Sequence, residues 1–124
     1  MRQGSRRAAE TALMSGGARQ TAGAVELRRG VLELAVLLLL RLENHGYAVR
    51  QSLKVNGLQV KEGTLYPLLR RLESKGLLRG RWDSTGDRLR KFYCLTEHGQ
   101  GCAEEMKQKF DALVVIIEGI HGKA

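Results

Sequence analysis

The sequence predicts a mainly α-helical domain of the α+β class, in which three helices precede a small β-hairpin and one long helix follows it. Three observations support this order. Apolar residues recur at helical spacing in three segments before residue 76. Two short runs rich in aromatic and branched residues then flank a turn-rich segment, as in a hairpin. A last apolar stripe at helical spacing ends the 124-residue chain. We expect one domain that, as a monomer, would bury only about 60 to 68% of its unfolded surface.

The first 26 residues are rich in Gly, Ala, Ser, Thr and Arg and hold almost no large apolar side chains. Such a composition buries too little apolar surface to fold by itself. We therefore expect residues 1–26 to be disordered or weakly ordered, with at most a short helix at residues 8–14. An arm along DNA, formed by Arg2, Arg6 and Arg7, is the alternative to a flexible tail. The segment also lacks the continuous apolar run of a signal peptide.

The first firm helix is predicted over residues 26–44, and His45-Gly46 ends it. Its stretch 31–40 is apolar on nearly every side, and such a helix must be covered on more than one side, which suggests that a second subunit packs against it. The stretch has about half of the roughly 20 residues that a bilayer crossing needs, and it contains Glu33. We therefore expect a core helix and no membrane association.

The second and third helices are separated by the turn signal Asn56-Gly57. The second is predicted over residues 47–55. The third begins between residues 61 and 64 and ends near Gly76, which supplies the left-handed stop that is common after helices. The order helix, helix, turn, helix is that of a helix-turn-helix module.

The third helix has a leucine stripe on one face and no leucine on the opposite face. The stripe spans about 60° to either side of Leu65, so it can be buried against the first helix and the hairpin. Pro67 is expected in the first turn, where its missing N–H removes no helical bond. The leucine-free face combines small residues with hydroxyl and guanidinium groups that bond phosphates and base edges, so we interpret it as a DNA-binding face. A solvated basic face is the alternative. The residues of this face and its flanks that are assigned to DNA are Gly63, Thr64, Tyr66, Arg70 and Arg71.

The hairpin is predicted from residues 77–82 and 90–95, joined by the turn-rich segment 83–87. A basic cluster beside its tip suits a phosphate backbone or a minor groove. A charged edge that discourages strand pairing is the alternative. Trp82 is a candidate to line an effector pocket for a small aromatic or hydrophobic molecule, or it packs against the helix layer. The basic cluster consists of Arg88, Arg90 and Lys91.

The last helix is predicted to follow Thr96 as its N-cap. Its apolar positions step by three or four residues, and this stripe has no remaining partner in the sequence. The stripe consists of Cys102, Met106, Phe110, Leu113, Ile117 and Ile120.

Positive charge is concentrated where DNA contacts are predicted. The chain has a net charge of +8, and residues 61–91 hold nine Lys or Arg against four Asp or Glu, whereas residues 92–124 carry a net charge of −2. A basic segment attracts polyanions, meaning nucleic acid or an anionic membrane surface, although a basic solvated face without a partner remains open.

No feature of the sequence indicates an enzyme, a cofactor or a metal site. There is no nucleotide-binding glycine loop, no paired-carboxylate cleft and no Cys/His pair with an activating spacing. Cys94 and Cys102 are interpreted as packing thiols of a reduced, cytoplasmic chain, with a redox pair as the alternative. The three histidines show no ligand spacing with them.

Three blocks of the sequence resemble the PadR family, the phenolic-acid-responsive winged-helix repressors. They are GVLE at 30–33 with HGY at 45–47, VKEGTLYPLLRRLE at 60–73 with GL at 76–77, and RKFY at 90–93 with LTEHG at 95–99. Together they span roughly residues 28–120. The GTLYP block followed by RLE is highly specific, whereas the LTxxG ending is shared with other winged-helix regulators.

The resemblance implies a winged helix-turn-helix DNA-binding domain over residues 27–95 and a C-terminal dimerisation helix over residues 96–124. It implies a homodimeric repressor of the short-tailed branch, with the third helix in the major groove of double-stranded DNA and the hairpin as the wing. It also assigns Lys61, at the start of the third helix, to the DNA-binding residues. An effector would bind between the subunits. Leu89 stands where many members have proline, which implies a less rigid wing.

The leading interpretation is thus a sequence-specific transcriptional repressor that binds an inverted-repeat operator as a homodimer. A winged-helix module that uses its basic face on an acidic protein is the alternative.

Overall fold

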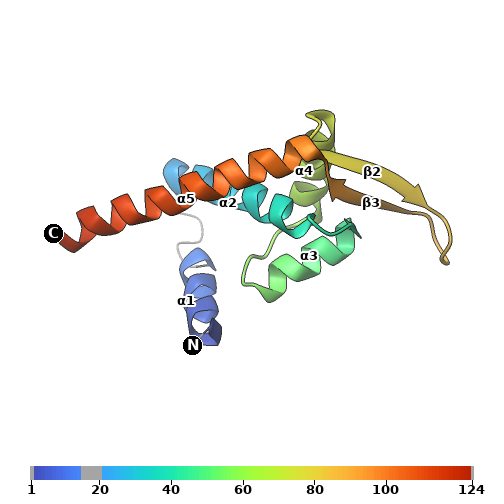
Figure 1. Cartoon of the computed structure of the whole chain (residues 1–124). Helices are drawn as coiled ribbons and strands as arrows, with labels where there is room; N and C mark the ends of the chain where they lie inside the picture. Colours follow the sequence, from blue (N-terminus) through green and yellow to red (C-terminus); the bar gives the residue numbers. More distant parts are fainter. Residues whose placement is uncertain (1, 15–20, 124) are drawn as a thin grey trace.

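The computed structural model describes residues 2–14 and 21–123, and Figure 1 shows how their elements are arranged. The predicted class, mainly α-helical with a small sheet, is confirmed. The described elements are α1 (Arg2–Met14), α2 (Ala22–Leu39), β1 (Asn44–His45), α3 (Gly46–Val55), α4 (Glu62–Ser74), β2 (Leu78–Asp83), β3 (Arg90–Leu95) and α5 (Glu97–Lys123).

The two N-terminal helices differ from the prediction. Helix α1 is longer than the short helix expected at residues 8–14, and α2 begins at Ala22 instead of residue 26. The earlier start has a local cause, because the Thr21 side chain accepts a hydrogen bond from the Ala24 N–H at 3.1 Å and so caps the helix. Residues 1 and 15–20 of the segment predicted to be disordered lie outside the described residues.

Helix α2 also ends five residues earlier than predicted, because the chain turns there into the sheet. The Leu40 carbonyl accepts a hydrogen bond from the Leu95 N–H at 2.9 Å, which ties this turn to β3. Strand β1 follows and pairs with β3, with His45 opposite Phe92. The predicted hairpin is therefore part of a three-stranded antiparallel sheet in the order β1-β3-β2. In Figure 1 the β2–β3 hairpin extends away from the helices.

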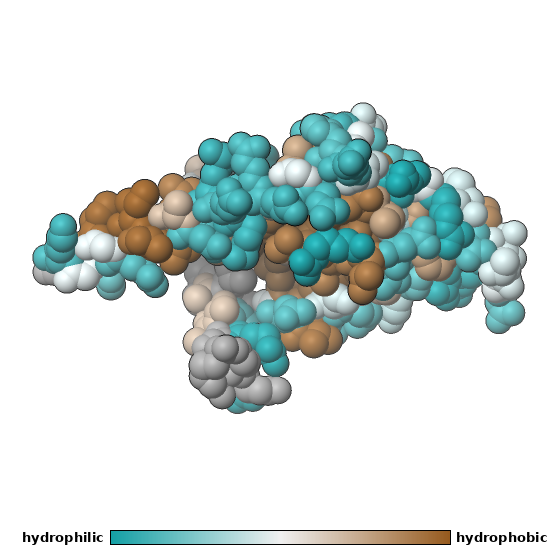
Figure 2. All heavy atoms as spheres, in the orientation of Figure 1, coloured by the Kyte–Doolittle hydropathy of each residue, from teal (hydrophilic) through white to brown (hydrophobic). Residues whose placement is uncertain are grey.

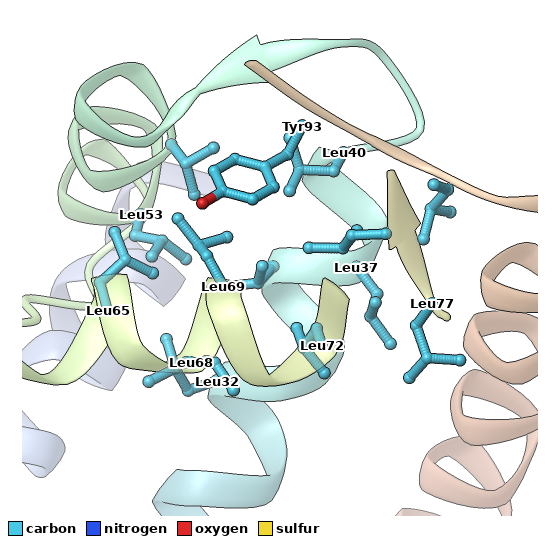
Figure 3. Packing of buried hydrophobic residues seen from close by; sticks show 14 of the residues in the cluster. Leu32, Leu37, Leu40, Leu53, Leu65, Leu68, Leu69, Leu72, Leu77 and Tyr93 are labelled. Atoms are coloured by element: carbon cyan, nitrogen blue, oxygen red, sulfur yellow. The ribbon is translucent and has the colours of Figure 1, made fainter. Parts of the chain in front are cut away.

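The leucine stripe of α4 forms the centre of the core, as predicted. Leu65, Leu69 and Leu72 are fully buried, together with Leu37 and Leu40 from α2 and the turn after it. Figure 3 shows these side chains meeting beside Tyr93 of β3. Burying each leucine stabilises the fold by about 1.5–3 kcal/mol, so this contact fixes the angle at which α4 presents its other face.

The start of α5 is locked against the connection between α4 and β2. Thr96 is the predicted N-cap, and its hydroxyl accepts from the Gly99 N–H at 2.9 Å and donates to the Gly76 carbonyl at 2.6 Å. A Cβ on Gly99 would lie only 2.0 Å from the Leu77 carbonyl oxygen. Gly76 has a φ of 79°, which confirms it as the left-handed stop after α4.

The far half of α5 is exposed and apolar. Cys102 and Met106 are partly buried against the core, but the stripe beyond them leaves the chain's own core, and Leu113, Ile117 and Ile120 are exposed. Figure 2 shows this apolar surface as a brown cluster towards the C-terminal end. None of the described helices has the length and apolar character needed to cross a membrane.

Candidate nucleic-acid interface

Helix α4 presents the leucine-free face to solvent. It begins at Glu62, after the extended residue Lys61, and the side chain of Lys61 makes no capping hydrogen bond. A Cβ on Gly63 would meet no atom within 4 Å, so the backbone can be approached closely at this point. Five of the six helix residues assigned to DNA are exposed: Lys61, Gly63, Thr64, Arg70 and Arg71.

Pro67 does not lie in the first turn, so that part of the prediction is wrong. It is the sixth residue of α4, where a residue with an N–H would donate to the carbonyl of Gly63. The proline removes this bond, and its ring crowds the same carbonyl. The helix continues through it because the leucine stripe on the other face is buried.

Tyr66, the sixth assigned helix residue, is half-buried against the start of α3. A Cβ on Gly46 would lie 2.2 Å from the Tyr66 Cε1 atom, so only glycine leaves room for the ring here. The contact joins α4 to the His45-Gly46 turn. The tyrosine thereby helps to position the helix as well as lining the surface beside it.

The predicted wing residues divide between the two faces of the hairpin. Arg88 and Arg90 are exposed. Lys91 instead turns towards α4, where its Nζ lies 2.7 Å from the Glu73 Oε1 atom and 5.2 Å from the centre of the Tyr93 ring. The hydrogen bond to Glu73 raises the pKa of Lys91. Lys91 therefore holds the wing against α4.

The opposite face of the hairpin is held by an ion pair that the sequence did not indicate. The guanidinium of Arg81 donates two hydrogen bonds of 2.8 Å to the carboxylate of Glu43, which precedes β1. It also lies 5.1 Å from the centre of the Phe92 ring. The bond from Arg81 lowers the pKa of Glu43. The hairpin is thus braced on both faces.

His45 connects the wing to the start of α3. Its Nδ1 atom accepts from the Ala48 N–H at 3.3 Å and caps α3, and its Nε2 atom lies 3.0 Å from an Arg90 nitrogen. Burial, and then the charge of Arg90, lower the pKa of His45. The neutral ring suits the cap, because only an unprotonated Nδ1 can accept. This role was missed, because histidine is not among the residues that are preferred at helix N-caps.

Two clefts flank the first turn of α4. The wing-side cleft, of about 490 Å³, lies between this turn, the start of α3 and the wing, and it includes His45, Tyr66, Arg88 and Arg90. The turn-side cleft, of about 520 Å³, lies on the other side of the turn, between α2, α3 and α4. It contains Arg28, Arg50 and Lys54, which the sequence analysis did not select. The spacing of Arg50 and Lys54, one helical turn apart, was the available signal.

Trp82 lies at the surface of the hairpin. Its side chain is 62% exposed, and Lys91 Nζ lies 5.6 Å from its ring centre. It is therefore not packed under the helix layer of its own chain. Among the described residues, no group of three or more His, Cys, Asp or Glu side chains could hold a metal ion.

Comparison with known proteins agrees with this geometry. Residues 36–105 match the Transcriptional regulator PadR-like family. A PadR family transcriptional regulator from Eggerthella lenta has a similar structure, with a TM-score of 0.74 and 39% identity over 80% of this chain and 88% of that one. A PadR-like transcription factor from Bacteroides fragilis aligns with a TM-score of 0.70 and 35% identity, covering 81% of this chain and 99% of its own.

Among curated proteins, the transcriptional regulator Rv3488 of Mycobacterium tuberculosis is 37% identical over 71 residues, which are 57% of this chain and 66% of that protein. The family match covers more than half of the chain and includes α3, α4, the wing and the start of α5. The chain therefore belongs to the PadR-like family of transcriptional regulators, which are DNA-binding proteins and not enzymes.

Proposed function

We propose that the protein is a homodimeric repressor that binds an inverted-repeat operator through α4 and the wing. The observation that carries this proposal is the first turn of α4, which is open at Gly63 and flanked by basic clefts. A helix enters the major groove where its backbone can come close and its neighbours can bind the phosphates on either side. Lys61, Thr64, Tyr66, Arg70 and Arg71 would contact the major groove or its edges, and Arg88 and Arg90 the backbone beside it.

The exposed stripe on α5 supports the dimer. A contiguous apolar surface of this kind is normally covered in a soluble regulator, and a second copy supplies the same surface by symmetry. A two-fold dimer would place the two α4 helices about 34 Å apart, one turn of DNA. An aromatic or hydrophobic effector bound between the subunits would change this spacing and release the operator. Trp82 is the chain's only tryptophan, so its fluorescence would report binding nearby.

The proposal is tested by fluorescence anisotropy on the DNA upstream of the protein's own coding sequence, beside a scrambled duplex, at two salt concentrations. Preferential binding to the native duplex that persists at the higher salt supports a sequence-reading regulator. Equal and salt-labile binding to both duplexes contradicts operator recognition and favours a basic module that binds an acidic protein.

Arg70→Ala and Arg88→Ala are each expected to weaken operator binding by roughly 1–3 kcal/mol, because each removes a guanidinium from the proposed interface. Both side chains are exposed, so the melting temperature should change little. Arg79→Ala is the matched control, because it removes the same charge at the end of β2 far from the hairpin tip. Unchanged binding by both interface variants, or an equal loss in Arg79→Ala, would show that the assigned face is wrong.

Gly63→Ala is expected to weaken operator binding without lowering the stability of the protein. The added methyl meets no atom of the protein, and alanine favours helix by up to about 1 kcal/mol, so thermal stability should not fall. Operator affinity should drop by about 1–3 kcal/mol, because the methyl would occupy space reserved for DNA. Gly101→Ala, at an equally open glycine of α5, is the control and should bind as the wild type does. If Gly63→Ala binds the operator with wild-type affinity, DNA does not approach the helix backbone closely at residue 63.

A further inference from the structure

We infer that the turn-side cleft is a phosphate-binding site that holds the DNA backbone on the side of α4 opposite the wing. The inference rests on the proposed function, and it adds a second strand contact from residues outside the helix and the wing. It assigns Arg28, Arg50 and Lys54 to this site together with Lys61.

The side chains that line the turn-side cleft favour the binding of an anion. The cleft is lined by four basic side chains, two glutamines, one threonine and one valine. Arg50 pairs with Glu62, whose carboxylate lies 3.7 Å from an Arg50 nitrogen at the edge of the cleft. Within the part of the chain that the structure describes, Arg28, Lys54 and Lys61 form no ion pair, so their charges are available to a ligand. Lysine and arginine around hydroxyl and amide donors are the usual partners of a phosphate group.

Two of the cations are already oriented by the backbone of the turn between α3 and α4. The Arg50 Nε donates to the Val60 carbonyl at 2.8 Å, and the Arg28 guanidinium donates to the Gln59 carbonyl. Each arginine uses some of its guanidinium N–H groups to bind a backbone carbonyl, and its other N–H groups can bind a ligand. Donors fixed in this way lose little side-chain entropy when an anion binds.

The position of the cleft identifies the source of the phosphate. Lys61 at the N-cap and Thr64 in the first α4 turn line the turn-side cleft, whereas Glu62 of this turn and Tyr66 just after it line the wing-side cleft. The first turn of α4 therefore lies between the turn-side cleft and the wing-side cleft. A helix in the major groove, which is about 12 Å wide, has one phosphate strand on each side. The wing-side cleft faces one strand, and the turn-side cleft faces the other.

The test measures salt dependence for Arg28→Gln and Lys54→Gln on the native and scrambled duplexes. The slope of log K against log salt is negative, and each lost phosphate contact should make it shallower by about 0.9. The corresponding loss of binding constant is roughly eightfold larger at 0.1 M salt than at 1 M. The loss should be the same on both duplexes, because a phosphate contact does not depend on the base sequence. Lys75→Gln, at the far end of α4, removes the same charge and should keep the wild-type slope.

The outcomes separate this site from the proposed function. If the wild type binds DNA and Arg70→Ala weakens it, but both cleft variants keep the wild-type slope, the phosphate site is overturned and the proposed function stands. If the wild type binds neither duplex, the proposed function itself fails.

A second measurement distinguishes backbone phosphate from a free anion. Inorganic phosphate is titrated into the wild type and Lys54→Gln without DNA, and the amide NMR signals of residues 54 to 64 are followed. Negligible shifts at a few millimolar phosphate, together with the reduced slopes, support the DNA backbone as the ligand. Saturable shifts that Lys54→Gln abolishes, with unchanged DNA slopes, would instead assign the site to a free phosphate-bearing molecule and overturn its role in DNA binding.

Discussion

Gly99→Ala is expected to destabilise the protein by roughly 1–3 kcal/mol or more, because the new methyl would overlap the backbone at the base of the wing. The added Cβ would lie 2.0 Å from the Leu77 carbonyl oxygen and 2.9 Å from the Leu95 Cδ2 atom. A flexible side chain can move away from such a contact, but the Leu77 carbonyl is fixed. It accepts a hydrogen bond from the Thr96 N–H at 3.1 Å. The helix α5 would have to shift from the sheet.

The matched control for this substitution lies two residues further along the same helix. A Cβ on Gly101 meets nothing within 4 Å, so Gly101→Ala should leave the melting temperature unchanged or raise it slightly. Thermal unfolding of the two variants and the wild type, at one protein concentration because dimerisation affects stability, gives the comparison. A melting temperature for Gly99→Ala equal to that of the wild type would mean that α5 does not start against Leu77.

Ile117→Glu is expected to convert the proposed dimer into monomers and to remove operator binding. The isoleucine is 61% exposed in the single chain and lies in line with Leu113 and Ile120. Burying one such side chain contributes about 1.5–3 kcal/mol, and two-fold symmetry counts it twice, so the dimer should weaken by roughly a hundredfold or more. A monomer would hold only one half-site. Light scattering after size exclusion gives the mass, and anisotropy gives the affinity.

Val115→Glu is the control for the interface face. Val115 is 68% exposed on the same apolar stretch, but it lies about 200° around the helix from Leu113. The Val115→Glu variant should therefore remain dimeric and bind the operator. Dissociation of Val115→Glu with a stable Ile117→Glu dimer would place the interface on the other face of α5. Two stable dimers would exclude this half of α5 as the main contact.

The parts of the fold that follow from local periodicity could be predicted from the sequence. The leucine spacing in α4 located its buried face, and Gly76 located its end. The two-residue strand β1 is too short to show alternation, so it was missed. The start of α2 was missed because the Thr21 cap precedes Ala22-Gly23-Ala24, a segment with no apolar period.

The parts of the site that depend on contacts between distant residues could not be predicted. Arg81 and Glu43 are 38 residues apart, and Lys91 and Glu73 are 18 apart. Nothing in either local pattern distinguishes a cation that braces the hairpin from one that is free to meet DNA. The turn-side cleft is a similar case, because Arg28 comes from α2 and reaches the turn before α4 only in the folded chain. Pro67 was misplaced for a different reason, since the start of α4 has no side-chain cap to mark it.

The double brace of the hairpin has a kinetic consequence. Because Lys91 holds one face to Glu73 and Arg81 holds the other to Glu43, the two strands of the wing are held in place before any duplex arrives. The free-energy cost of ordering each side chain, about 0.5–1.5 kcal/mol, then falls on folding and not on association with DNA. Encounter with DNA needs no conformational search by this segment. The association rate should therefore be governed by diffusion and long-range charge, and differences between strong and weak operators should lie in how long the complex lasts.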